Sequence, residues 1–306
     1  MTRPIWGSDV RAASYRDHAG LIYDQGPSTF EDLMAGTEVW TDRTFLVYGA
    51  RHISFAQFRA AAQAARTHLA DIGVRPGERV MVFGYNSPEW IVALWSLWLA
   101  GAVPVLANRW WSAAEIAHAV DLLAPSHILS DTTLGVDTPT SALGEIRATF
   151  DADTVVPRPA IVSDPDAPAL ILFTSGSSGM PKAVELARRS VIANQQDILV
   201  RSGRLPHLLD DGSRQVVSLA TTPMFHIGGL SSLLTHFLTG GKIVMAEGRF
   251  DPLQILGLIE RERIQIWGAV PTMAIRILEH PDFESFDLSS LRSWPLGGAP
   301  VTTALL

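Results

Sequence analysis

The residues best suited to chemistry lie in one run, Thr174-Ser175-Gly176-Ser177-Ser178-Gly179-Met180-Pro181-Lys182. Its Ser and Thr residues supply hydroxyl groups, its two glycines leave backbone N–H groups open to a ligand, and Lys182 adds an ammonium group. Polyphosphate is bound by such clusters of N–H donors, hydroxyls and a cation. Only two of the chain's 24 Lys and Arg residues are lysine, so composition alone does not explain this one. The run predicts a phosphate-binding loop, with a flexible Gly/Ser turn between strands as the alternative.

Several other site signatures are missing from the sequence. There is no Gly-x-x-x-x-Gly-Lys-[Ser/Thr] loop, no Gly-x-Gly fingerprint for dinucleotides and no Gly-x-Ser-x-Gly elbow. The lack of cysteine excludes disulfides, zinc–thiolate sites and cysteine nucleophiles. Five histidines without ligand spacing are assigned no role, namely His52, His68, His118, His236 and His280.

Composition favours a folded globular protein over a disordered or nucleic-acid-binding one. Of the 306 residues, 47% are apolar and 18% are charged, and the formal net charge is -7. This length corresponds to about two domain-sized units. Nucleic-acid-binding proteins present a basic face to phosphates, whereas the nearest basic run here is Arg188-Arg189. We therefore predict no nucleic-acid partner.

One apolar stretch raises the alternative of a membrane span. The segment 90–107 carries almost no polar group and approaches the length needed to cross a bilayer. However, Gly101 and Pro104 interrupt it, and Ser87-Pro88 before it has the form of a helix cap followed by proline in the first turn. A buried helix and a strand are therefore favoured. Because no apolar signal segment follows Met1, a cytoplasmic protein without a transmembrane span is predicted.

Hydrophobic periodicity predicts alternating helices and strands, as in a layered α/β fold. Capping boxes begin at Ser54 and Ser112. The predicted helices are 55–72, 88–100, 113–123, 229–238, 252–262 and 271–279. The predicted strands are 79–83, 103–106, 127–129, 169–173, 183–186, 215–219, 242–245 and 264–267. The short connections of the first strands predict a parallel sheet. Residues 138–168 are expected to form a surface connection with one short helix, and 301–306 to begin another helix.

The run Thr174–Lys182 resembles the phosphate-loop signature of the adenylate-forming superfamily, which includes acyl-CoA synthetases, firefly-type luciferases and the adenylation domains of peptide synthetases. Further segments resemble that family in order and spacing over roughly residues 25–306. They are Gly73–Val80, Asn86–Trp90, Ala100–Pro104, Pro223–Gly229, Val270–Thr272 and Gly297–Pro300. Pro223–Gly229 resembles fatty-acyl and aryl CoA ligases more than peptide-synthetase domains.

The resemblance implies a reaction in two steps. A carboxylate attacks the α-phosphate of ATP, which gives an acyl-adenylate and pyrophosphate, and a thiol, usually that of coenzyme A, then takes the acyl group. Mg²⁺ offsets the phosphate charge. The implied substrates and cofactors are therefore a carboxylic acid, ATP, Mg²⁺ and coenzyme A.

The resemblance also assigns residues to sites, with no metal ligand among them. The implied ATP-binding residues are Thr174, Ser175, Gly176, Ser177, Ser178, Gly179, Lys182, Gly298, Ala299 and Pro300. The implied acyl pocket consists of His226, Val270, Pro271, Thr272 and Gly297. His226 is also assigned a catalytic role; on the residues alone, a core histidine in an apolar setting is the alternative.

The implied fold is α/β, with the layered α/β/α subdomains of the adenylate-forming N-terminal domain. We expect 1–306 to be an incomplete AMP-binding domain, divided into a subdomain 76–205 and a subdomain 15–75 plus 206–306. The family's Tyr-Gly-x-Thr-Glu segment, β-barrel subdomain and C-terminal domain are absent from this sequence. Ala183 and Ala187 also depart from the family pattern, which usually has glycine and a hydroxyl residue or histidine there. This fragment is therefore expected to be inactive without the missing C-terminal domain.

The sequence thus predicts part of an acyl-CoA ligase that activates a fatty or aryl acid. Two alternatives stay open. One is an acyl-AMP ligase that passes its product to a carrier protein, and the other is a shortened, non-catalytic paralogue that binds nucleotide or acyl groups.

Overall fold

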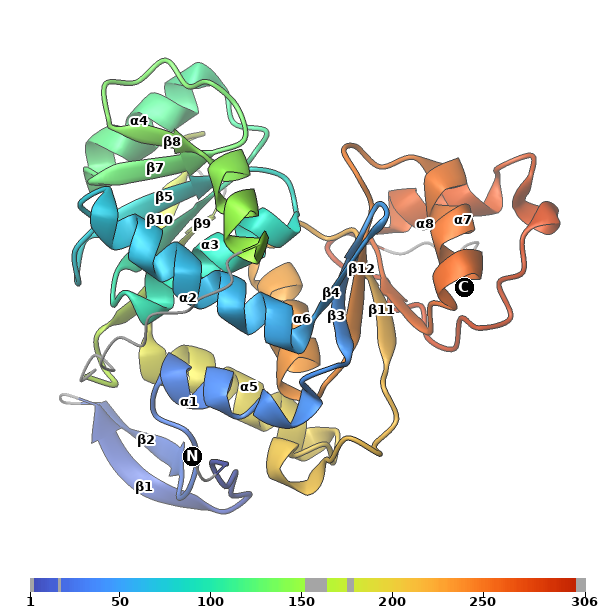
Figure 1. The fold of residues 1–306 in the computed structure, drawn as a ribbon, viewed down its shortest axis with the longest axis horizontal. Coiled ribbons are helices and arrows are strands. Elements are labelled where there is room, and N and C mark those ends of the chain that lie inside the picture. The colour runs from blue at the N-terminus through green and yellow to red at the C-terminus, as the bar shows by residue number, and fades with distance from the viewer. Residues whose placement is uncertain (1–2, 16–17, 152–163, 175–178, 301–306) are drawn as a thin grey trace.

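The computed structural model describes residues 3–15, 18–151, 164–174 and 179–300, and these form layers of helices and sheets (Figure 1). The larger sheet has the strand order β10-β9-β6-β5-β7-β8. Its strands are β5 Arg79–Phe83, β6 Val103–Ala107, β7 His127–Ser130, β8 Thr140–Ala142, β9 Pro168–Thr174 and β10 Lys182–Ala187. Strand β5 pairs parallel with β6 and β7, and β6 pairs parallel with β9, which confirms the predicted parallel sheet. Strand β10 returns antiparallel to β9.

A second sheet has the order β13-β11-β12-β3-β4. Its strands are β3 Thr44–Tyr48, β4 Arg51–Ser54, β11 Val217–Ala220, β12 Lys242–Met245 and β13 Ile266–Gly268. All pair in parallel except β4, which is antiparallel to β3. The sequence predicted the last three strands within two residues but missed β3 and β4. The proposed subdomain boundaries stay a prediction, although this sheet does combine strands from 44–54 with strands from 217–268.

The helices follow the sequence closely. They are α1 Phe30–Ala35, α2 Phe55–Asp71, α3 Pro88–Leu99, α4 Ala113–Leu123, α5 Arg188–Arg201, α6 Ile227–Leu238, α7 Pro252–Glu262 and α8 Pro271–Leu278. The short 3₁₀ helices are η1 Glu38–Trp40, η2 Leu143–Asp151, η3 Pro206–Leu208 and η4 Phe283–Ser285. Both predicted capping boxes form, since Ser54 and Ser112 each accept a hydrogen bond from the backbone N–H three residues later. Helices α1 and α5 were not predicted.

The elements form five layers: α4, the larger sheet, a central layer of helices, the second sheet, and α7 with α8. Side chains that alternate along each strand face the layers on either side. On β5, Val80 and Val82 point to one buried cluster, while Met81 and Phe83 point to another. The first cluster fills the space between the two sheets and holds α2, α3, α5 and α6. Helix α4 covers the outer face of the larger sheet, and α7 and α8 cover the outer face of the second (Figure 1).

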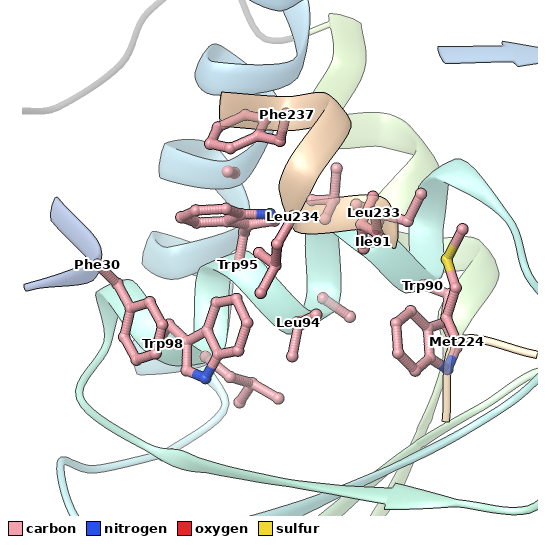
Figure 2. Close-up of a cluster of buried hydrophobic side chains, with 14 of the residues drawn as sticks. Phe30, Trp90, Ile91, Leu94, Trp95, Trp98, Met224, Leu233, Leu234 and Phe237 are labelled. Carbon is pink, nitrogen blue, oxygen red and sulfur yellow. The ribbon is translucent and has the colours of Figure 1, made fainter. Parts of the chain in front are cut away.

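Helix α3 lies at the centre of this arrangement, and all twelve of its residues are buried. Trp98 stacks on Phe30 with ring centroids 4.1 Å apart, and its Nε1–H donates to the carbonyl oxygen of Ala169 at 2.7 Å. Figure 2 shows Trp95 facing Phe237 of α6, at a centroid distance of 4.4 Å. The apolar stretch 90–107 is therefore a buried helix followed by β6. No helix within the described residues is both long and apolar enough to cross a membrane.

Three regions differ from the sequence-based expectation or lie beyond it. A hairpin of β1 Val10–Tyr15 and β2 His18–Tyr23 was not predicted, and its described residues are mostly exposed. The connection 138–168 contains β8 as well as the expected short helix, which is η2. The helix expected at 301–306 lies outside the described residues.

Replacing Trp95 by alanine should strongly destabilise the fold, because its buried ring also contacts Phe30, Phe58 and Trp98. We expect Trp95→Ala to lower the free energy of unfolding by about 3–5 kcal/mol, measured by urea denaturation followed by circular dichroism. The control is Trp110→Ala, because Trp110 is 57% exposed and its loss should cost less than about 1 kcal/mol. Equal losses for the two variants would contradict a core centred on α3.

Candidate functional site

Three cavities lie where parallel strands of the two sheets end. They are lined by segments that directly follow β5, β6, β11, β12 and β13, together with both strands that flank the predicted phosphate loop. The carboxyl ends of parallel strands are the usual ligand-binding edge of an α/β sheet. We call them the loop cavity, of about 670 Å³, the apolar cavity, of about 830 Å³, and the arginine cavity, of about 460 Å³.

The loop cavity contains the stem of the predicted phosphate loop. Strands β9 and β10 pair so that Thr174 lies opposite Lys182, and Thr174, Gly179 and Pro181 line this cavity. Gly179 has a φ of +81°, a conformation that other residues rarely adopt. His118 of α4 contacts the carbonyl oxygen of Pro181 at 3.1 Å and so ties the loop's end to the outer helix. The predicted residues Ser175, Gly176, Ser177 and Ser178 lie outside the described residues.

Lys182 is available to an anion in a way that the other lysine is not. Lys242 pairs with the carboxylate of Glu262 at 3.2 Å and links β12 to α7. Lys182 is exposed at the loop stem, and the described residues give it no ion-pair partner. An exposed ammonium group on the strand position opposite Thr174 suits a phosphate ligand.

His226 lies at the junction of two cavities, because it lines both the loop cavity and the apolar cavity. It is the N-cap residue of α6, and its backbone N–H donates to the carbonyl oxygen of Pro223 at 3.2 Å. Its ring lies against Phe225, with centroids 4.5 Å apart. The His226 side chain stays accessible to solvent, but the protein atoms around it remove part of its hydration, and this desolvation lowers the pKa of His226 below its usual value. The imidazole is therefore neutral near pH 7.

The apolar cavity brings together part of the predicted acyl pocket and part of the predicted adenine loop. Val270, Gly297 and Gly298 line it with His226, and none of its described lining residues is Asp, Glu, Lys or Arg. Gly298 has a φ of +79°. The other predicted residues do not line this cavity. Pro271 is buried at the first position of α8, whereas Thr272, Ala299 and Pro300 are exposed beside the cavity-forming segments.

The structure adds residues that the sequence did not single out. Trp110 and Met273 line both the apolar and the arginine cavities, and Phe225 lines both the loop and the arginine cavities. The arginine cavity is named for three cations on its wall, Arg109, Arg249 and Arg276. The only available sequence signal is position, because Arg109 and Arg249 follow shortly after predicted strands.

Two of the arginines, Arg109 and Arg276, are held in place by aromatic rings, and Arg109 also by a carboxylate. The Arg109 guanidinium lies 4.8 Å from the ring centroid of Tyr85, and its Nε is 2.7 Å from Oδ1 of Asp131. Arg276 lies 5.1 Å from the ring centroid of Phe250. Three cations around a cavity with aromatic walls favour a ligand that carries several negative charges and a flat ring.

The AMP-binding enzyme family matches residues 35–306 of this sequence. The chain belongs to the AMP-binding enzyme family. Feruloyl-CoA synthase from Amycolatopsis sp is 31% identical over 274 residues, a match that covers 86% of this chain and 52% of that protein. 4-Coumarate–CoA ligase 2 from Oryza sativa subsp. japonica is 31% identical over 290 residues, covering 82% of this chain and 48% of that protein. The chain thus spans about half the length of these relatives.

Solved structures of AMP-binding enzymes share the fold. O-succinylbenzoate coenzyme A synthetase from Bacillus subtilis, in complex with ATP and magnesium ion, has a TM-score of 0.74 and 27% identity, covering 89% of this chain and 55% of that one. A fatty acyl CoA synthetase from Mycobacterium tuberculosis has a TM-score of 0.77 and 22% identity, covering 91% of this chain and 56% of that one. The expected α/β architecture of the adenylate-forming N-terminal domain is therefore confirmed.

The donor groups of the site fit phosphate better than they fit a metal ion. The stem of the loop offers the Thr174 hydroxyl and the Lys182 ammonium on neighbouring strands. Within the described parts of the chain, no group of three or more His, Cys, Asp or Glu residues is placed to hold a metal.

The depressed pKa of His226 is directly measurable. We expect its ring protons, followed by NMR between pH 4 and pH 9, to titrate below the value of about 6.5 for an unperturbed histidine. The reference is the same chain unfolded in urea, and His226→Gln assigns the signal. Because the folded pKa is lower, protonation favours the unfolded state, so this histidine reduces stability as the pH falls through that range. A midpoint above 6.5 would mean that a nearby anion, not desolvation, controls the ring.

Proposed function

We propose that this chain forms the nucleotide-, acid- and thiol-binding part of an ATP-dependent acid–thiol ligase. The observation that carries the proposal is the position of His226, on the wall shared by the loop cavity and the apolar cavity. One cavity offers groups that suit a polyphosphate, and the other has an apolar lining that suits an acyl group. A carboxylate held in the second cavity thus meets a nucleotide held in the first at this residue.

On the nucleotide side, Thr174 and Lys182 would hold the β- and γ-phosphates of ATP together with Gly179 and the rest of the predicted loop. Gly298, at the rim of the apolar cavity, would approach the adenine. A glycine suits this place because its φ is +79°, a conformation that other residues rarely adopt. Magnesium, when bound, would neutralise phosphate charge.

On the acid side, the apolar cavity would accept an aromatic acid. Its walls combine aliphatic side chains with Trp110 and Met273, and two glycines, Gly228 and Gly268, leave space where a larger side chain would intrude. The relatives named for feruloyl and 4-coumarate substrates support an aryl acid over a long-chain fatty acid. We place the acid's ring between Trp110 and α6, with its carboxylate toward His226.

On the acceptor side, the arginine cavity would hold the phosphate groups of coenzyme A. Its three arginines match a ligand with several phosphates, and the rings of Tyr85 and Phe250 hold two of them, Arg109 and Arg276, at its wall. It adjoins the apolar cavity through Trp110, Pro223 and Met273. A thiol attached to a ligand in one cavity therefore has a short route to an acyl group in the other. Such a cluster of cations favours free coenzyme A over a carrier protein as the acceptor.

The chemistry then follows from these positions. In the first step, a carboxylate oxygen of the acid attacks the α-phosphorus of ATP, and the bond from that phosphorus to the β-bridging oxygen breaks, releasing pyrophosphate. In the second step, the sulfur of the thiol attacks the acyl carbon, its proton is lost and AMP leaves. Lys182 would stabilise the charge on the departing pyrophosphate. His226 would orient the carboxylate as a neutral hydrogen-bonding ring.

The loss of Lys182 should weaken ATP binding. A hydrogen bond from a charged group contributes about 1.5–3 kcal/mol, so Lys182→Ala should raise the Kd for ATP roughly 10- to 150-fold in isothermal titration calorimetry. Lys182→Arg keeps the charge and should lose less. The control is Lys242→Ala. This variant removes the other lysine, whose ammonium group pairs with Glu262 instead of facing the site, so it should leave the Kd for ATP unchanged. An unchanged Kd in Lys182→Ala would refute the role of this residue.

Filling the apolar cavity should block the acid. An added Cβ at Gly228 meets nothing within 4 Å, and Gly228 lines the cavity, so Gly228→Phe should fold and project its ring into that space. We expect it to weaken binding of 4-coumaroyl sulfamoyl adenosine by about 1–3 kcal/mol, roughly 5- to 150-fold in Kd. Gly135→Phe is the control, since Gly135 is equally open. Equal affinities in the two variants would argue against an acid in this cavity.

A further inference from the structure

The side chain of Asn86 joins two distant parts of the site. Its Nδ2–H donates to the carbonyl oxygen of Thr222 at 2.9 Å, and its Oδ1 accepts from the backbone N–H of Met224, also at 2.9 Å. These partners are 136 and 138 residues away in sequence and lie on either side of Pro223. One amide group thus fixes both ends of the turn that leads into His226.

That turn depends on an outside partner because of its own sequence. Pro223 has no N–H group to donate, and its carbonyl oxygen already accepts from the backbone of His226. The first turn of α6 lies directly on the same carbonyl, since a Cβ added at Gly229 would come within 2.3 Å of it. The turn is therefore packed tightly against the helix on one side and held by Asn86 on the other.

Asn86 is itself mounted on rigid structure. It follows β5 and precedes Ser87, whose hydroxyl caps α3 by accepting from the N–H of Trp90 at 3.1 Å. Met224, on the other side of the contact, is buried in the same cluster as Trp90, and Figure 2 shows the two side chains next to each other. Asn86 and Met224 thus connect the turn to α3, the fully buried helix at the centre of the fold.

Movement of this turn would change the walls of the three cavities. Phe225 lines the loop and arginine cavities, and His226 lines the loop and apolar cavities. The Phe225 ring also meets Trp110 edge-on at 5.5 Å, and Trp110 meets Tyr85 at 6.3 Å. Asn86 itself lines only the arginine cavity, and its amide is engaged with the backbone on both sides. Its influence on the other two cavities passes through the turn.

We propose that Asn86 is a positioning residue that sets the place of His226 and Phe225 relative to the bound acid and nucleotide. The proposal rests on the function assigned above, because that function identifies what the cavities hold. The hydrogen bonds that carry it are independent of that function. A residue that served only the stability of the fold would affect unfolding without any specific effect on ligands that touch His226.

The first arm of the test needs no ligand. Asn86→Ala removes the acceptor for the Met224 N–H, so hydrogen exchange of that amide, followed by NMR in the folded 306-residue chain, should accelerate by roughly tenfold or more. The matched control is Asn194→Ala, which removes an exposed amide on α5 that accepts from Gln195 and Ser231. Unchanged exchange at Met224 in Asn86→Ala would overturn the proposal.

The second arm measures coupling to His226. Asn86→Asp is nearly isosteric and keeps the acceptor for Met224, but it places a carboxylate oxygen against the carbonyl oxygen of Thr222. We expect Asn86→Asp to raise the Kd for 4-coumaroyl sulfamoyl adenosine roughly tenfold. In a chain that already carries His226→Ala, the same substitution should raise the Kd much less. Asn86→Gln, which keeps both polar groups but lengthens the side chain, should show the same dependence if Asn86→Asp fails to fold. Equal losses in the two backgrounds would overturn the proposal, because Asn86 would then act independently of His226.

The two arms separate this proposal from the proposed function. If the unsubstituted chain binds no acyl-adenylate analogue while Met224 exchange still responds to Asn86→Ala, the proposed function fails and Asn86 still positions the turn. If the analogue binds but both Asn86→Asp and Asn86→Gln bind it equally well, the positioning role fails and the proposed function stands.

Discussion

The fold depends on the complete burial of α3. A helix that is apolar on every side needs apolar partners all around it, and here the larger sheet, α1, α2 and α6 supply them. Two parallel sheets that share one helical layer bring the carboxyl ends of their strands to common cavities. The end of β9, the turn after β11 and the segment after β13 therefore line adjoining cavities, although about 100 residues separate the first from the last. The core thus determines where the site forms.

Elements with strong local signals could be predicted from the sequence, and elements that depend on distant partners could not. Strand 79–83 and helix 252–262 were placed residue for residue, because apolar runs and caps define both ends. Helix α5 was missed because its buried face includes Arg188, Gln195 and Gln196, which hides the hydrophobic period. Strands β3 and β4 form an antiparallel hairpin around Gly49-Ala50, a local signal that was overlooked. Only the pairing of β3 with β12, about 200 residues away, lies beyond the local sequence. No local pattern carries that information.

The same distinction applies to the site. Adjoining cavities are lined by Thr174, Gly179, His226, Val270 and Gly297, because each belongs to a compact motif with its own spacing. Lys182 is exposed at the loop stem and does not line these cavities. Trp110, Met273 and the three arginines were not predicted, since they share only their position after the ends of different strands. Asn86 is intermediate. Its segment was noticed as a helix cap, but its bonds to the backbone around Pro223 arise only when the two sheets pack together.

Charge placement explains why a neutral histidine suits the junction. The cations lie outside it, with Lys182 at the loop stem and Arg109, Arg249 and Arg276 around the arginine cavity. Under the proposed function, a cationic ring at the junction would pair with the acid's carboxylate and make its lone pairs less available for attack on phosphorus. Desolvation lowers the pKa of His226 and so keeps the ring uncharged while it can still donate a hydrogen bond. Asn86 fixes the adjoining turn with a neutral amide, so the junction acquires its geometry without an added charge that would compete for the nucleophile.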